Sequence, residues 1–202
     1  MNDAQQAPVR GRTRWRPFAI VLGAGIALST AMVLGVANGA IAASFAVSGS
    51  TFKVSADKLD GTGFVQYGGV VQQKNGTQIP VAVSGIKSAS LTNLCQSVTV
   101  PGGISLVIRA GKTTPATATD LLIDMSQLSG DATFNNISIG QDASTLNKGP
   151  SGAAGVAGGF GQQADSVTIT NLQQVAWSTS AGTFVLNGLD LHISLTGEQC
   201  FA

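Results

Sequence analysis

The 202-residue chain has few charged side chains and contains a single histidine. From residue 44 onwards, six lysines and Arg109 stand against eight aspartates and Glu198, a net charge of −2 (7 − 9). This part carries no basic stripe of the kind that binds nucleic acid. With one histidine and no Cys-x-x-Cys, the usual zinc ligand sets are missing, and no calcium-loop spacing of aspartates occurs. We therefore expect no nucleic-acid partner, no metal ion and no cofactor.

The chain also lacks the Gly-x-Ser-x-Gly motif and the alternating strand–helix pattern of α/β-hydrolases. A Ser–His–acid mechanism would have to use His192, the only histidine. Asp190, His192 and Ser194 alternate with apolar residues, so they share one face of an expected strand. Same-face neighbours on a strand lie about 6.6–7 Å apart at the backbone and project in parallel. This spacing favours a solvated polar face over a hydrogen-bonded triad, and the three residues are kept as candidates for catalysis.

The most informative segment lies at the N-terminus, where an uncharged run over residues 18–43 follows four closely spaced arginines, Arg10, Arg12, Arg14 and Arg16. Arginines resist translocation whereas apolar residues partition into lipid, so this pattern is typical of an export segment. As a transmembrane helix, the run would span roughly 39 Å, enough to cross a hydrocarbon core of about 30 Å with tilt. As a signal peptide, it would be cleaved near Ala42, after a small-x-small pattern.

These observations divide the chain into three parts. Residues 1–17 are expected to form a basic cytoplasmic region, residues 18–43 a transmembrane anchor or a signal peptide, and residues 44–202 an exported domain. An uncleaved segment would make the membrane a partner and would hold the domain at the outer face of the cytoplasmic membrane, with the N-terminus inside. A cleaved segment would make the protein secreted.

Hydrophobic residues in the exported domain recur with a period of two. The clearest alternating segments are 79–83, 104–108, 121–125, 167–177 and a final run over 184–195. Asn75-Gly76 is a hairpin signal, since this pair tolerates the positive φ angles of a type I′ turn. No internal window shows helical periodicity with caps. Short strands at roughly ten-residue spacing predict an all-β fold, either an antiparallel sandwich or a curved, barrel-like sheet, after one N-terminal hydrophobic helix.

Cys95 and Cys200 are the only cysteines of the chain. An even pair in an oxidising compartment most often forms a disulfide. Closing a loop of this length would stabilise the fold by about 4–5 kcal/mol in the chain-entropy model. We therefore expect a structural disulfide that holds the C-terminus against the middle of the domain.

Residues 149–161 interrupt the alternation with a glycine-rich stretch. Glycine has a high entropic cost of ordering and offers little to pack, so a long flexible surface loop is expected. The alternative is a lid or a lipid-contacting loop with Val156 and Phe160 as apolar tips. Ser151 in this loop is a further candidate nucleophile.

Long blocks of the domain resemble an exported protein family of high-GC Gram-positive bacteria. The blocks are FKVSADKLDGTGFVQYG (52–68), PVAVSGIKSASLTNLCQSV (80–98), LSGDATFNNISIGQDASTL (128–146), FGQQADSVTITNLQQVAWSTSAGTF (160–184) and LNGLDLHISL (186–195). Members of this family are largely uncharacterised. Some are labelled cholesterol esterase, and the resemblance therefore implies hydrolysis of sterol esters outside the cell.

Two functions of different classes remain open at this stage. The first is a non-enzymatic envelope protein whose β domain binds a lipid, a sterol or another surface component on an apolar sheet face. The second is a lipid-ester hydrolase in which His192 activates Ser194 or Ser151.

Overall fold

The computed structural model describes residues 48–100 and 102–202 of the chain. The expected cytoplasmic region at 1–17 and the expected transmembrane or signal segment at 18–43 lie outside these residues. Within the part of the chain that is described, no helix is long and apolar enough to cross a membrane.

The described domain consists of antiparallel strands, so the prediction of an all-β antiparallel fold is confirmed. Its elements in chain order are β1 (Phe52–Gln72), β2 (Gln78–Thr92), β3 (Leu94–Val100), β4 (Ile104–Ala110), β5 (Ala116–Asn135), β6 (Ser138–Asp142), the 3-10 turn η1 (Ala143–Thr145), β7 (Phe160–Ser180), β8 (Thr183–Val185) and β9 (Asp190–Ser194). The strands β1, β5 and β7 have 21, 20 and 21 residues. Each is about twice as long as the short strands that were predicted from the roughly ten-residue spacing of the turns.

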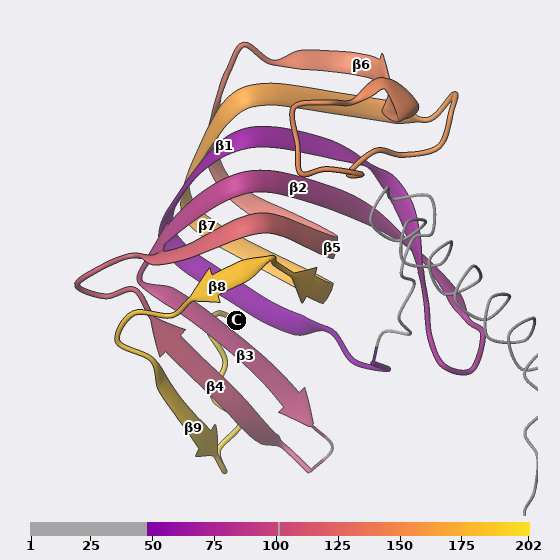
Figure 1. Ribbon diagram of the computed structural model, residues 1–202. Helices are drawn as coiled ribbons and strands as arrows, with labels where there is room; N and C mark the ends of the chain where they lie inside the picture. Colours follow the sequence, from indigo (N-terminus) through magenta and orange to yellow (C-terminus); the bar gives the residue numbers. More distant parts are fainter. Residues whose placement is uncertain (1–47, 101) are drawn as a thin grey trace, which may run out of the picture. The chain divides into compact units, whose positions relative to one another are not determined.

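Four long strands pair in a circle. β1 pairs with β2 and with β7, and β5 pairs with the other edges of these same two strands. All nine strands belong to one sheet, and Figure 1 shows the long strands bending sharply as they cross the domain. Of the two expected architectures, a curved sheet closed on itself describes the domain better than a sandwich of two separate sheets.

The side chains that point into the circle form the main hydrophobic core. Buried residues such as Phe64, Ile86, Leu121 and Val167 come one from each of the four long strands. Full burial of one such side chain contributes roughly 1.5–3 kcal/mol relative to exposure. Because this core is complete within the domain, Ser44–Ala202 form a compact unit by themselves.

Three residues with positive φ interrupt the regular alternation of these strands. Asn93, Asp120 and Asn171 have φ values of 52°, 49° and 53°. In β7, for example, Val167 and Ile169 face the core at odd positions, whereas Leu172 and Ala176 face it at even positions. A residue in the left-handed region shifts the alternation and bends the strand, and Asn and Asp tolerate this conformation better than most residues. At Asn171 the shift coincides with a β-bulge, because β7 has an extra residue there relative to β5, whereas the pairing register continues unbroken past Asn93 and Asp120. These left-handed residues explain how strands of about 20 residues can wrap around one core.

Two local predictions need correction. The hairpin at Asn75-Gly76 is present, but only Gly76 has positive φ (87°), so the turn is not type I′. The Asn75 side chain instead accepts a hydrogen bond from the Thr77 backbone at 3.0 Å. The run over 184–195 is not one strand, because Gly188 (φ 65°) separates β8 from β9.

The predicted disulfide between Cys95 and Cys200 is present, with a Cα–Cα distance of 5.7 Å. Two further contacts hold the end of the chain. The backbone N–H of Cys200 donates to Ser97 Oγ on β3 at 3.1 Å. Lys53 Nζ on β1 donates to the Phe201 carbonyl at 3.0 Å and lies 4.9 Å from the centre of its ring. The C-terminal segment 196–202, here called the tail, is thereby fixed across β1 and β3.

The glycine-rich loop over 149–161 packs against β1 rather than extending freely into solvent. A Cβ at Gly149 would clash with the Val65 side chain, and one at Gly155 would lie 2.7 Å from the Ala143 Cβ. Asp142 Oδ2 accepts a hydrogen bond from the Gly158 backbone at 2.8 Å. The glycines at positions 149 and 155 therefore permit close packing of the loop, and its flexibility stays a prediction.

Asp120 provides a test of the backbone requirement at the left-handed residues. Asp120→Gly should leave the free energy of unfolding nearly unchanged, because glycine adopts positive φ without steric cost. Asp120→Val should lower it by about 1–2 kcal/mol, since a side chain branched at Cβ is strained at positive φ, a conformation that aspartate tolerates better. Equilibrium unfolding in urea measures both changes, with Thr117→Val on the same strand as the control for a new valine. Equal losses for the Gly and Val variants would contradict this account.

Candidate functional site

Three short strands extend the sheet beyond the closed circle. β3 continues the course of β2 past Asn93 and pairs with the first residues of β1, opposite Lys53–Ser55. β4 pairs with β3, and β9 pairs with β4 and forms the edge of the sheet. Figure 1 shows these three strands side by side, and we call them the terminal sheet.

One face of the terminal sheet is apolar and uncovered. Val98, Leu106 and Ile193 lie opposite one another in consecutive strands, as do Gln96, Ile108 and Leu191. Exposed fractions reach 66% at Ile193 and 79% at Leu195, and no described residue covers these side chains. This apolar face comprises Val98, Val100, Ile104, Leu106, Ile108, Leu189, Leu191, Ile193 and Leu195.

The apolar face is an extension of the core-facing side of the sheet. Val54 of β1 is buried in the core, and its register partner on β3 is Gln96, in the same row as Ile108 and Leu191. The strands therefore have the alternating apolar pattern of core strands, but this part of their inner face is in contact with solvent. Contiguous apolar surface of this kind is typical of interaction sites.

The opposite, polar face of the terminal sheet is covered by the tail. Ser194 is only 8% exposed, and its Oγ accepts hydrogen bonds from the backbone N–H groups of Thr196 and Glu198, both at 3.3 Å. The sequence prediction of a solvated polar face over Asp190, His192 and Ser194 is therefore wrong for Ser194. It fails because the tail folds back onto that face, which strand periodicity does not reveal.

Four charged side chains join the tail to β4 and β9. Arg109 Nη2 donates to Glu198 Oε1 at 2.7 Å, and Glu198 Oε2 lies 3.3 Å from His192 Nε2. His192 Nδ1 in turn lies 2.9 Å from Asp190 Oδ1. The hydrogen bond with Asp190, followed by that with Glu198, raises the pKa of His192 above its usual value. The hydrogen bonds with Arg109 and His192 lower the pKa of Glu198.

The structure brings together only part of the predicted catalytic set. Asp190 and His192 do form a hydrogen bond, although their spacing on one strand argued against it, because the side chains incline toward each other. The second ring nitrogen of His192 faces Glu198, while Ser194 Oγ lies 3.0 Å from Thr196 Oγ1. Among the described residues, neither serine candidate is hydrogen-bonded to His192.

Ser151 is placed far from the charged cluster. It lies in the glycine-rich loop, which packs on Val65 of β1. The terminal sheet is attached to β1 at Ser55, ten positions earlier in the same strand (65 − 55). The catalytic roles of Ser151, Ser194, His192 and Asp190 therefore stay predictions. In the described ranges 48–100 and 102–202, no three His, Cys, Asp or Glu side chains are grouped so that they could hold a metal ion.

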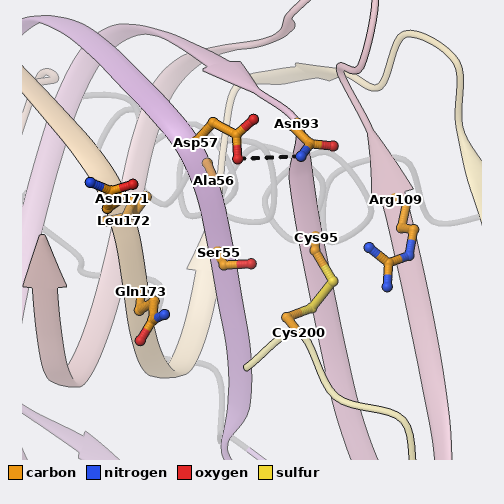
Figure 2. A pocket seen from close by; sticks show the side chains of 10 residues that line it. All are labelled: Ser55, Ala56, Asp57, Asn93, Cys95, Arg109, Asn171, Leu172, Gln173 and Cys200. Atoms are coloured by element: carbon orange, nitrogen blue, oxygen red, sulfur yellow. Dashed lines mark hydrogen bonds between the residues drawn. A yellow bond between two sulfur atoms is a disulfide. The ribbon is translucent and has the colours of Figure 1, made fainter. Parts of the chain in front are cut away.

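A polar cavity of about 280 Å³ lies where the terminal sheet meets β1 and β7. Part of its lining is a row of register partners across the sheet, Gln173, Ser55, Cys95 and Arg109. Asn171, Asp57 and Asn93 also line the cavity, and Figure 2 shows these side chains. Asn93 and Asn171 are two of the left-handed residues described above.

Sequence reasoning did not identify this cavity. Its side chains come from four strands that are distant in the sequence, and each one alone resembles an ordinary solvent-facing strand residue. The sequence feature that could have indicated the cavity is a single Asn within an alternating strand, at positions 93 and 171. Asn at such a position often marks an irregularity in the strand, because it tolerates positive φ.

The model of a family described as "Family of unknown function (DUF6230)" matches residues 48–201 of the chain. Neither the curated proteins nor the solved structures contain a significant match.

The charged cluster makes a prediction for the pKa of His192. NMR titration of this single imidazole should give a pKa above about 6.5, and Glu198→Gln should shift it downward because one carboxylate partner is lost. Asp142→Asn, which removes a carboxylate at the end of β6, should leave it unchanged. An unshifted imidazole in the wild-type protein would contradict the arrangement.

The same cluster predicts how attachment of the tail depends on pH. Since the pKa of His192 is raised in the folded protein, its contribution is fully present below about pH 6.5 and is lost as the pH rises through the folded value. The pKa of Glu198 is lowered, so its contribution is present above about pH 4.5 and is lost as the pH falls through the folded value. Amide hydrogen exchange in the tail should be slowest between these limits, and a rate independent of pH after correction for intrinsic exchange would exclude this role.

Proposed function

The chain belongs to this family of unknown function, and we propose that it is an exported envelope protein whose β domain binds membrane lipid through the apolar face of the terminal sheet. The observation that carries the proposal is the apolar face itself. Its residues continue the core-facing side of the sheet, and six of the nine are exposed, whereas Val98, Leu106 and Ile108 are half-buried.

The chemistry of the apolar face suits lipid. The side chains of its nine residues are all aliphatic and carry no hydrogen-bonding group. Burial of aliphatic surface is favourable without directional contacts, which matches the fluid acyl region of a bilayer. Transfer of four fully exposed Leu or Ile side chains from water would contribute roughly 6–12 kcal/mol at most.

The position of the terminal sheet in the chain also supports a membrane partner. Only residues 44–51 separate the uncharged run over 18–43 from the start of β1, and eight residues span at most about 29 Å. The start of β1 is paired with β3, so the chain enters the domain beside the terminal sheet. Given a strand spacing of about 4.8 Å, β9 lies about 14 Å from β1. A run anchored in the membrane would therefore keep the apolar face close to the lipid surface.

Binding to vesicles tests the proposal without the contribution of the N-terminal run. Residues 44–202 form a compact unit and should sediment with vesicles of phosphatidylglycerol and phosphatidylethanolamine. The double variant Leu191→Ser/Ile193→Ser should bind at least about tenfold more weakly, because two apolar contacts become polar. Ile139→Ser on β6 is the matched control, since Ile139 is 65% exposed and Ile193 is 66% exposed. Equal sedimentation of the wild type and the double variant would contradict the proposal.

A sterol-ester hydrolase is the second candidate, and the contact between Asp190 and His192 is the specific observation in its favour. In this reaction His192 Nε2 would have to leave Glu198 and accept a proton from a serine hydroxyl. Release of acid from cholesteryl oleate by residues 44–202 should then disappear in His192→Ala and persist in Glu198→Gln. Release that is unchanged in His192→Ala would remove any mechanism based on histidine.

A further inference from the structure

The polar cavity lies on the side of the sheet opposite the apolar face. Cys95 and Arg109 point toward the tail, whereas their strand neighbours Gln96 and Ile108 belong to the other side. In Figure 2, Arg109 and the disulfide lie on one side of Asp57, and Asn171 and Gln173 lie on the other. A ligand in the cavity would therefore not compete with a lipid surface at the apolar face.

The lining groups retain hydrogen-bonding capacity. Asn93 Nδ2 donates to Asp57 Oδ1 at 3.3 Å, and among the described residues the second Asp57 oxygen and the Asn93 side-chain oxygen accept no hydrogen bond. Arg109 uses one nitrogen for Glu198. Within the described residues, the side chains of Ser55 and Gln173 form no hydrogen bond. The cavity thus presents several donors and several acceptors within a small space.

The balance of charge favours a neutral ligand. Asp57 and Arg109 are the only charged residues that line the cavity, and they have opposite signs. Glu198 already partners Arg109, so an anionic ligand would meet two carboxylates and a guanidinium that is partly occupied. A cationic ligand would meet the guanidinium. An apolar ligand would leave amide, carboxylate and hydroxyl groups without partners, which is costly.

Hydroxyl groups match this lining because each can donate and accept at once. Side-chain amides, such as those of Asn93 and Gln173, also offer both functions. The volume lies near the lower end of the range for small-molecule sites, about 300–1,000 Å³. We propose that the cavity binds a neutral saccharide, as a unit of a cell-surface glycan.

The site is also organised before any ligand binds. The disulfide fixes the tail beside Cys95, the left-handed backbone at Asn93 sets the position of its amide, and Glu198 holds the guanidinium of Arg109. Preorganised groups lose little conformational entropy on binding. A domain with lipid on its apolar face and a saccharide in this cavity would connect the membrane surface to the glycan outside it.

NMR titration of ¹⁵N-labelled residues 44–202 tests the proposal with three probes: cellobiose and the N-acetylglucosamine disaccharide, which are neutral, and glucuronate, which is anionic. At least one neutral probe should shift the backbone amides of Ser55, Asp57, Asn93 and Gln173. Asp57→Ala and Gln173→Ala should each weaken this binding by at least about tenfold. Gln127→Ala is the matched control, because Gln127 is also an exposed strand glutamine but lies outside the cavity.

Three results would overturn the proposal. The first is an absence of shifts at the cavity with both neutral probes at millimolar concentration. The second is binding of glucuronate alone. The third is equal binding by the wild type and Gln173→Ala, with a dispersed spectrum that shows the variant to be folded. Because Leu191→Ser/Ile193→Ser leaves the cavity intact, this variant should bind saccharide as the wild type does even if lipid binding proves absent.

Discussion

The attachment of the C-terminal tail to β3 is the constraint on which the functional surfaces of this protein depend. The terminal sheet is amphipathic, and a single short tail can cover only one of its two faces. The disulfide between Cys95 and Cys200 and the ion pair between Arg109 and Glu198 place the tail on the polar face. The aliphatic residues of the other face are left in contact with solvent, although they continue the surface that forms the core over β1.

The left-handed residues in the long strands form the second level of this architecture. Asn93, Asp120 and Asn171 bend strands that would otherwise run straight past one another, and they allow β1, β2, β5 and β7 to close around one core. Two of the same residues line the polar cavity, because side chains at a left-handed residue no longer follow the alternation of a regular strand. Closure of the fold and the shape of the cavity therefore share one structural cause.

The two faces differ in the ligands that they suit. The apolar face offers hydrophobic surface without hydrogen-bonding groups, which matches lipid. The cavity offers hydrogen-bond donors and acceptors in fixed directions, which match sugar hydroxyls. The disulfide and the four ionisable side chains hold the tail, and Cys95, Cys200 and Arg109 among them also line the cavity. In this arrangement His192 lies between two carboxylates, which contact both of its ring nitrogens.

Several features followed from the sequence by itself, because each depends on local pattern or on composition. Period-two alternation determined the all-β class, and the presence of only two cysteines determined the disulfide. The common face of Asp190, His192 and Ser194 also followed from alternation. Only the tertiary structure decided which face of that strand is covered and where Asn93 and Asn171 shift the alternation. It also decided that Ser151 and His192 lie in segments that contact different parts of β1. These properties depend on contacts between residues that are distant in the sequence, and a periodicity of two is the same whichever face is buried.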